Sequence, residues 1–124
     1  MRLIAAVCLT LSLAWLWDRL LRLLKFEQKI RIGIGVPIGE EAIKYFMAVA
    51  FHFHPLIIYS LFGFGEGCLE TFLLKKPSAL KLIIAGGLIH FCFGVFFLFP
   101  IPPIFSLSFG ITAHLLWNNL LIKD

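Results

Sequence analysis

The chain has 124 residues, of which 60% are hydrophobic and 15% are charged, and its formal net charge is +4. An ordinary soluble domain is about 45–50% apolar and about 25% charged. A soluble core of this size could not bury so much apolar surface, which argues against a soluble globular domain, a disordered chain and a nucleic-acid-binding protein. We therefore expect an all-α integral membrane protein, a bundle of about five transmembrane helices.

Five apolar segments approach the ~20 residues that a helix needs to cross a bilayer. In chain order they are 3–17, 33–53, 56–74, 82–99 and 104–122. Proline marks three of the breaks between them, because it removes a backbone donor and clashes with the preceding helical turn. These breaks are His54-Pro55, the turn at 75–78 and the stretch 100–103.

Lysine and arginine favour the cytoplasmic side of membrane proteins. Five spans would put nearly all of them on one side: Arg19, Arg22, Lys25, Lys29, Arg31, Lys75, Lys76, Lys81 and Lys123. We therefore expect a multi-pass protein of the cell (plasma) membrane, with the N-terminus outside and the C-terminus cytoplasmic. It would be one transmembrane helical domain over 1–124, with a peripheral first span and basic linker in 1–31 and a catalytic core in 32–124.

The predicted spans carry several polar residues, although an ionisable group at membrane depth costs about 2.5–3.5 kcal/mol. They are Glu40, Glu41 and Lys44 in the second span, Glu66 and Glu70 in the third, His90 in the fourth, and His114 and Asn118 in the fifth. Residues three or four apart share a helix face, so these residues form polar stripes. At 1.5 Å per residue the stripes lie about 6–14 Å from the cytoplasmic ends of their spans. We expect them to form one site.

Glycines accompany two of these stripes. Gly63 and Gly67 share a face with the glutamates of the third span, and Gly86 and Gly94 share a face with His90. Small residues let helices approach closely in membranes. We therefore expect another helix to pack closely against each of these faces.

Carboxylates and imidazoles in one cavity suit two kinds of chemistry. In hydrolysis, a Glu takes a proton from water while His and Asn donate to the oxyanion, or Glu and His bind a zinc ion that activates the same water. In proton or cation movement, Glu and His relay charge. The sequence has no His-Glu-x-x-His, Gly-x-Ser-x-Gly or P-loop motif, so serine and phosphate-transfer chemistry have no support.

Four motifs in order resemble those of the PrsW-type intramembrane proteases, which belong to a wider group with CAAX-processing and CAAX prenyl endopeptidase-like proteins. Residues 39–44 resemble a Glu-Glu-x-x-Lys motif, and residues 59–70 are similar to a second motif with Tyr, Gly-x-Gly and Glu. His90 stands where the family has an isolated intramembrane histidine. Residues 114–118 resemble a closing His-Gly-Leu-Trp/Tyr-Asp/Asn motif.

The resemblance implies a membrane hydrolase that cleaves a membrane-associated peptide or protein without a Ser or Cys nucleophile. It implies that Glu40 or Glu41 is the general base or a metal ligand. It further implies that Glu70 and His90 position the water, while His114 and Asn118 polarise the carbonyl. Metal-dependent and metal-free mechanisms are both open; a metalloprotease would bind zinc through Glu41, Glu70, His90 and His114. Lys44 and Glu66 would support the site.

The chain departs from the family pattern in several ways. Thr71 replaces the usual Asn, Leu115 replaces a Gly, and Asn118 stands where many members have Asp. Asn is neither a base nor a strong ligand, which favours an oxyanion-donor role for Asn118. The chain is also short, which leaves open a minimal core, a need for a partner subunit or for a second copy of the chain in a homo-oligomer, or a loss of activity.

Two other interpretations stand beside the protease. A non-catalytic relative would use the same polar stripes to bind a membrane partner. A small membrane protein could instead conduct protons or cations through them. In each case the partners are the lipid bilayer and a membrane protein, peptide or ion, and not a nucleic acid.

Overall fold

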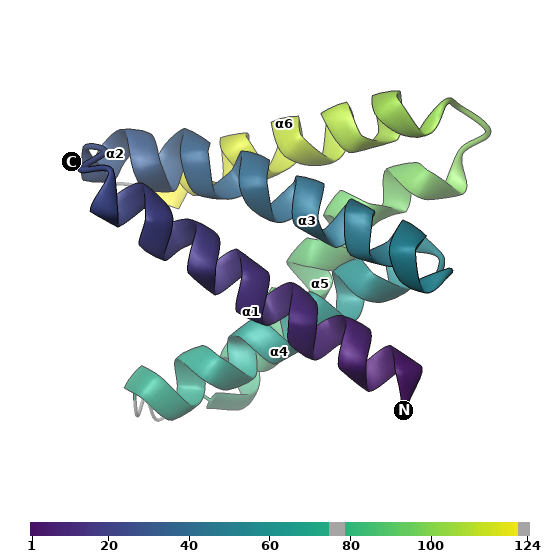
Figure 1. Cartoon of the computed structure of the whole chain (residues 1–124), viewed down its shortest axis with the longest axis horizontal. Helices are drawn as coiled ribbons and strands as arrows, with labels where there is room; N and C mark the ends of the chain where they lie inside the picture. The colour runs from purple at the N-terminus through teal and green to yellow at the C-terminus, as the bar shows by residue number, and fades with distance from the viewer. Residues whose placement is uncertain (75–78, 122–124) are drawn as a thin grey trace.

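The computed structural model describes residues 1–74 and 79–121, in which all regular secondary structure is helical (Figure 1). The elements are α1 (Arg2–Leu23), α2 (Gln28–Ile30), a π-helix (Arg31–Gly35), α3 (Val36–Phe51), α4 (Pro55–Leu74), α5 (Ala79–Gly94), a 3-10 helix (Val95–Leu98) and α6 (Pro103–Leu121). The all-α prediction is confirmed. The predicted turn at 75–78, with Lys75 and Lys76, and the C-terminal Lys123 lie outside the described residues.

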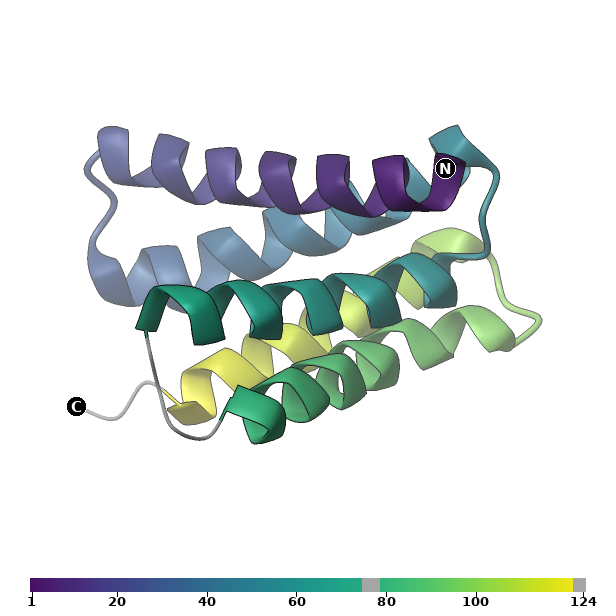
Figure 2. The ribbon, with the colours of Figure 1, turned by 90° about the horizontal axis from the view of Figure 1, so that it is seen from below.

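The five long helices form a bundle in which α3 is central. It contacts α1, α4 and α6, while α4 and α5 lie side by side along most of their length (Figure 2). α1 lies on one side of the bundle and crosses α4 in Figure 1. The helix with the most predicted polar residues therefore lies between α1, α4 and α6.

The helix ends agree with the sequence at the proline breaks but not in α1. α3 ends at Phe51, where His52 adopts the left-handed conformation (φ 59°), and α4 begins at Pro55. The predicted end of the first span at position 17 is wrong, because α1 continues to Leu23. Asp18 and Arg22 pair one turn apart on this helix at 2.9 Å, so the charged residues continue the helix.

α4 and α5 approach backbone to backbone at Gly63 and Gly86. A Cβ on Gly63 would lie 2.3 Å from the carbonyl oxygen of Gly86, and a Cβ on Gly86 would lie 2.6 Å from that of Gly63. Neither distance leaves room for a side chain. The glycine stripes predicted from the sequence therefore pack closely, against each other, and bring Glu66 beside His90.

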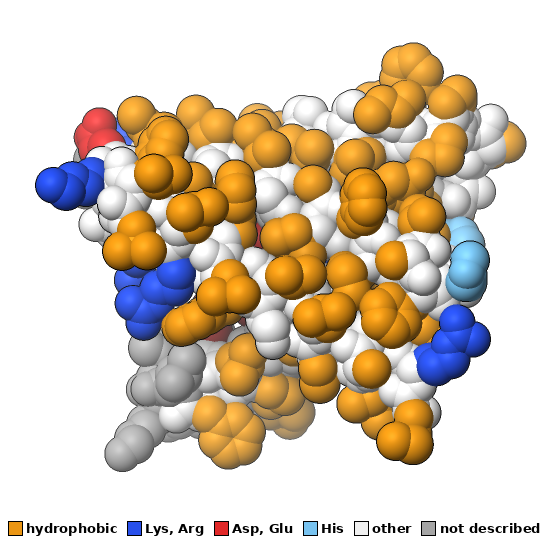
Figure 3. Space-filling model, in the orientation of Figure 1, with side chains coloured by type: hydrophobic (Ala, Val, Ile, Leu, Met, Phe, Trp, Pro, Cys, Tyr) orange, Lys and Arg blue, Asp and Glu red, His pale blue; other side chains and the backbone are white. Residues whose placement is uncertain are grey.

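Large apolar side chains are exposed on the surface of the described residues, while several charged side chains are buried. Hydrophobic side chains cover most of the face shown in Figure 3, and Phe46 and Leu116 are 74% and 63% exposed. Glu41 and Lys44, in contrast, are fully buried. By length and composition, one helix within the described residues could cross a membrane, namely α1; Ile83–Leu98 is a shorter apolar helix.

Candidate functional site

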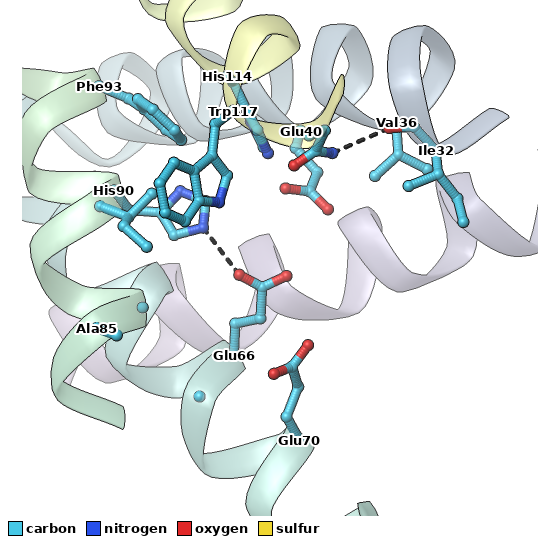
Figure 4. Close-up of a pocket in the computed structure, with 14 residues that line it drawn as sticks. Ile32, Val36, Glu40, Glu66, Glu70, Ala85, His90, Phe93, His114 and Trp117 are labelled. Carbon is cyan, nitrogen blue, oxygen red and sulfur yellow. Dashed lines mark hydrogen bonds and ion pairs between the residues drawn. The ribbon is translucent and has the colours of Figure 1, made fainter. Parts of the chain in front are cut away.

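A cavity of about 430 Å³ between α3, α4, α5 and α6 contains most of the predicted site residues (Figure 4). Its polar lining residues are Glu40, Glu66, Glu70, His90, His114 and Asn118. Apolar side chains, including those of Phe93 and Trp117, complete its wall. Four helices thus bring to one space the residues whose similar depths suggested one site, apart from Glu41 and Lys44.

Glu40 and Glu41 are adjacent in sequence but have different surroundings. Glu40 lines the cavity. Glu41 is fully buried, and its Oε1 lies 2.6 Å from Nζ of Lys44 and 2.8 Å from Nδ1 of His114. Oε2 of Glu41 is buried without a hydrogen-bond partner and would lie 3.4 Å from a Cβ on Gly110. Glu40 is therefore the member of the pair that can reach a molecule in the cavity.

Lys44 links the carboxylates of α3 to α5. Besides Glu41, its Nζ lies 2.9 Å from Nδ1 of His90 and 3.7 Å from Oε2 of Glu40. It also lies over the ring of Phe62, 4.4 Å from the centroid. Hydrogen bonds, opposite charge and a cation–π contact together offset the cost of burying the ammonium group.

The two ring nitrogens of His90 have different partners. An ammonium group can only donate, so Nδ1 of His90 accepts a hydrogen bond from Lys44. In the neutral imidazole the proton is then on Nε2, which donates to Oε2 of Glu66 at 2.8 Å (Figure 4). Glu66 stands where the related motif has a Phe, yet it is a direct partner of His90.

Two groups of side chains in the described part of the chain lie close enough together to share a metal ion: Glu41, His90 and His114, and Glu40, Glu66 and His90. The first does not fit zinc as arranged, because the Lys44 ammonium already contacts Glu41 Oε1 and His90 Nδ1. The second would use Nε2 of His90, which faces Oε2 of Glu66 at 2.8 Å and would have to lose its proton to bind a metal ion. Glu70 lines the cavity but belongs to neither group.

Asn118 makes a contact that the sequence did not predict. Its Nδ2 donates to the carbonyl oxygen of Ile32 at 2.9 Å, and Nδ2 of Asn119 donates to that of Gly33 at 3.1 Å. Both carbonyls belong to the π-helix, in which the backbone hydrogen-bond register differs from that of an α-helix. The amide group expected to polarise a substrate carbonyl thus binds the backbone that leads into α3.

α1 contacts the same segment from the other side. Nε1 of Trp17 donates to the carbonyl oxygen of Gly35 at 2.8 Å, and a Cβ on Gly39 would lie 2.0 Å from this nitrogen. Asp18 also pairs with Arg31. The first span was predicted to be peripheral; it lies at the side of the bundle but helps to position Glu40. Gly35 and Gly39, four residues apart in the sequence, were the available signal for such a contact.

A second cavity, of about 310 Å³, lies on the α1 side of the same carboxylates. It shares Glu40, Glu66 and Glu70 with the first cavity. Its other lining residues include apolar Leu11, Trp15, Phe62 and Leu69 and charged Asp18, Arg22 and Arg31. The three carboxylates can therefore be reached from two sides.

No protein-family model, curated protein or solved structure matches this chain. The site itself therefore carries the functional argument.

Proposed function

We propose that this chain is an intramembrane peptidase of the PrsW type that its motifs resemble, in which Glu40 activates water to cleave a membrane-associated peptide or protein. The observation that carries the proposal is the single cavity in which carboxylates of α3 and α4 face imidazoles of α5 and α6. Buried ionisable groups are costly, and inside a membrane they typically mark functional sites.

In this proposal the five long helices cross the plasma membrane, with the C-terminus in the cytoplasm. The outward position of large apolar side chains, such as those of Phe46 and Leu116, supports a lipid environment. The burial of Glu41 and Lys44 as a pair supports it too, because charged groups within a bilayer face the bundle interior and pair with one another.

The proposed reaction is the hydrolysis of a peptide bond. Glu40 takes a proton from water, and the water oxygen bonds to the carbonyl carbon of the substrate. The C–N bond of the tetrahedral intermediate then breaks, and the proton on Glu40 passes to the leaving amine. The N–H at Nε2 of His90, which contacts Glu66 when no substrate is bound, would turn from Glu66 to the oxyanion that forms on the carbonyl oxygen.

The second cavity offers the substrate a route to Glu40, the residue proposed to activate the water. A membrane-embedded segment could lie against Leu11, Trp15 and Leu69. Its scissile bond would then reach the carboxylates that both cavities share. The apolar wall favours a hydrophobic segment over a polar peptide.

The test is a comparison of new protein N-termini. Purified protein in nanodiscs is incubated with the membrane fraction of its source cells, and new N-termini are identified by mass spectrometry. Glu40→Gln should lower their yield by about 10²-fold or more, the contribution of a general base. Glu27→Gln, at an exposed position before α2, is the matched control and should act like the wild type.

Two results would contradict the proposal. One is a folded wild-type protein that produces no new N-termini; proton or cation flux in vesicles would then favour the conducting interpretation. The other is a Glu40→Gln variant that cleaves as fast as the wild type.

A further inference from the structure

The imidazoles of His90 and His114 lie almost perpendicular to each other, with ring centroids 5.4 Å apart. Both are tied to Lys44. Nδ1 of His90 contacts its ammonium group directly, at 2.9 Å. Nδ1 of His114 contacts Oε1 of Glu41, the same oxygen that Lys44 binds at 2.6 Å. The two rings thus contact the same ion pair: His90 contacts the Lys44 ammonium group, and His114 contacts the Glu41 carboxylate.

Because Nδ1 of His90 faces a cation and Nδ1 of His114 faces an anion, the two rings carry their protons on different nitrogens. The Lys44 ammonium has only donors, so Nδ1 of His90 must accept, and the proton of the neutral ring is on Nε2. The Glu41 carboxylate oxygen accepts from Lys44 and has only acceptor capacity to offer, so Nδ1 of His114 donates to it. The neutral His114 ring then has an unprotonated Nε2.

We infer that Lys44 is a positioning residue that gives the two site histidines opposite tautomers. The catalytic meaning of this inference rests on the proposed function. His90 is then the hydrogen-bond donor to the substrate carbonyl oxygen, and His114 is an acceptor that can orient the attacking water for Glu40. This assignment reverses the role that the family resemblance implies for His114, the polarisation of the carbonyl.

Lys44 is better suited than Glu66 to set the tautomer of His90. The Glu66 side chain is 36% exposed, and it faces the cavity that a substrate would enter. The Lys44 side chain is fully buried and is held by Glu41 and by the ring faces of Phe62 and Tyr59. A fixed group that can only donate imposes one tautomer whether or not substrate occupies the cavity.

The direct test is the ¹⁵N NMR spectrum of the histidine rings in detergent-solubilised protein, because protonated and unprotonated ring nitrogens have well-separated shifts. We expect His90 to be protonated at Nε2 and His114 at Nδ1. The variants His90→Gln and His114→Gln assign the signals. His54 is an internal reference, since its Nδ1 accepts from the backbone N–H of Leu56 at 3.3 Å.

Removal of Lys44 tests its role. Lys44→Met alone would leave Glu41 as an unpaired buried charge, so the double variant Lys44→Met/Glu41→Gln is measured as well. In the variant that folds, Nδ1 of His90 loses its donor while Nε2 still faces Glu66, and the Nδ1 signal should shift because an unprotonated nitrogen that accepts no hydrogen bond has a different shift. Lys25→Met removes an exposed charge outside the cavity and should leave every histidine signal in place.

A wild-type His90 protonated at Nδ1, or histidine spectra that do not change when Lys44 is removed, would overturn the inference. The spectra need no substrate, so the two proposals can fail separately. The expected tautomers without any cleavage would contradict only the proposed function. Cleavage together with the wrong tautomers would contradict only the role of Lys44.

Discussion

Nε1 of Trp17 lies 2.8 Å from the carbonyl oxygen of Gly35, and this hydrogen bond joins α1 to the π-helix that leads into α3. Asn118 and Asn119 bind two other carbonyls of the same π-helix from α6. Three side chains from two helices therefore fix the backbone that precedes Glu40. The position of the proposed base depends on these contacts, of which only that between Asn118 and Ile32 involves residues that line the cavity.

Trp17→Phe should destabilise the protein by about 1–3 kcal/mol, because the carbonyl of Gly35 loses its donor while the aromatic packing is largely kept. Thermal unfolding in detergent measures the change. Trp15→Phe is the matched control, since Trp15 is 56% exposed, and should have little effect. Equal stability losses in the two variants would show that the Trp17 hydrogen bond has no special role.

Gly63→Ala should separate α4 from α5, since the new Cβ would meet the carbonyl oxygen of Gly86. The expected cost is about 1–3 kcal/mol, typical of overpacking a tight contact. Cleavage should fall as well, because the contact holds Glu66 beside His90. Cys92→Ala, at an exposed position on α5, is the control for unfolding and cleavage. Wild-type stability and cleavage in Gly63→Ala would contradict the close packing of the two helices.

Glu40→Gln and Glu41→Gln should differ in their effects on stability. Glu41→Gln removes the closest charged partner of the buried Lys44 and should cost about 3–5 kcal/mol. Glu40 lies 3.7 Å from the same ammonium, so its replacement should abolish cleavage with a smaller loss of stability. Chemical unfolding and cleavage are measured on both variants. A larger stability loss for Glu40→Gln would contradict the separate roles of the pair.

Removing Lys44 should create a metal site. Lys44→Ala frees Glu41 Oε1 and His90 Nδ1 beside His114, a donor set suited to zinc. Added zinc should therefore raise the melting temperature of Lys44→Ala more than that of the wild type or of Lys25→Ala. Near-stoichiometric zinc in the purified wild type, lost in Glu40→Gln, would instead place a metal in the natural site.

Much of this arrangement follows from spacing alone. The depths of Glu66, His90 and His114 along their helices predicted a common site, because the helical rise is nearly constant. The spacing of Gly63 and Gly86 relative to these polar residues predicted close packing for the same reason. Both arguments depend only on regular helix geometry, and the structure brings the residues together.

Other features depend on contacts between helices that spacing does not specify. Glu40 and Glu41 are neighbours on one helix, and their surroundings differ because of Lys44 and His114, which come from different places in the chain. The π-helix changes the backbone hydrogen-bond register just before Glu40 and Glu41. The pattern of apolar and polar residues does not reveal this change. Asn118 binds the carbonyl oxygen of Ile32 within this π-helix.

Cysteine labelling tests whether the water-accessible charged cavity lies inside a membrane-embedded bundle, as we propose. The natural cysteines Cys8, Cys68 and Cys92 are replaced by Ser, and single cysteines are introduced by Phe46→Cys and Leu116→Cys on the outside or by Ala85→Cys and Trp117→Cys in the cavity. The proteins are reconstituted in vesicles, and a charged thiol reagent is present on both sides of the membrane. The labelling rate in denaturant serves as the reference for a fully accessible cysteine.

Phe46 and Leu116 are more exposed than Trp117, at 74% and 63% against 38%. We predict the reverse order of labelling rates, because lipid shields the outward cysteines while water reaches those in the cavity. Labelling rates that instead follow the exposed fractions, fastest for Phe46→Cys, would contradict a membrane-embedded bundle.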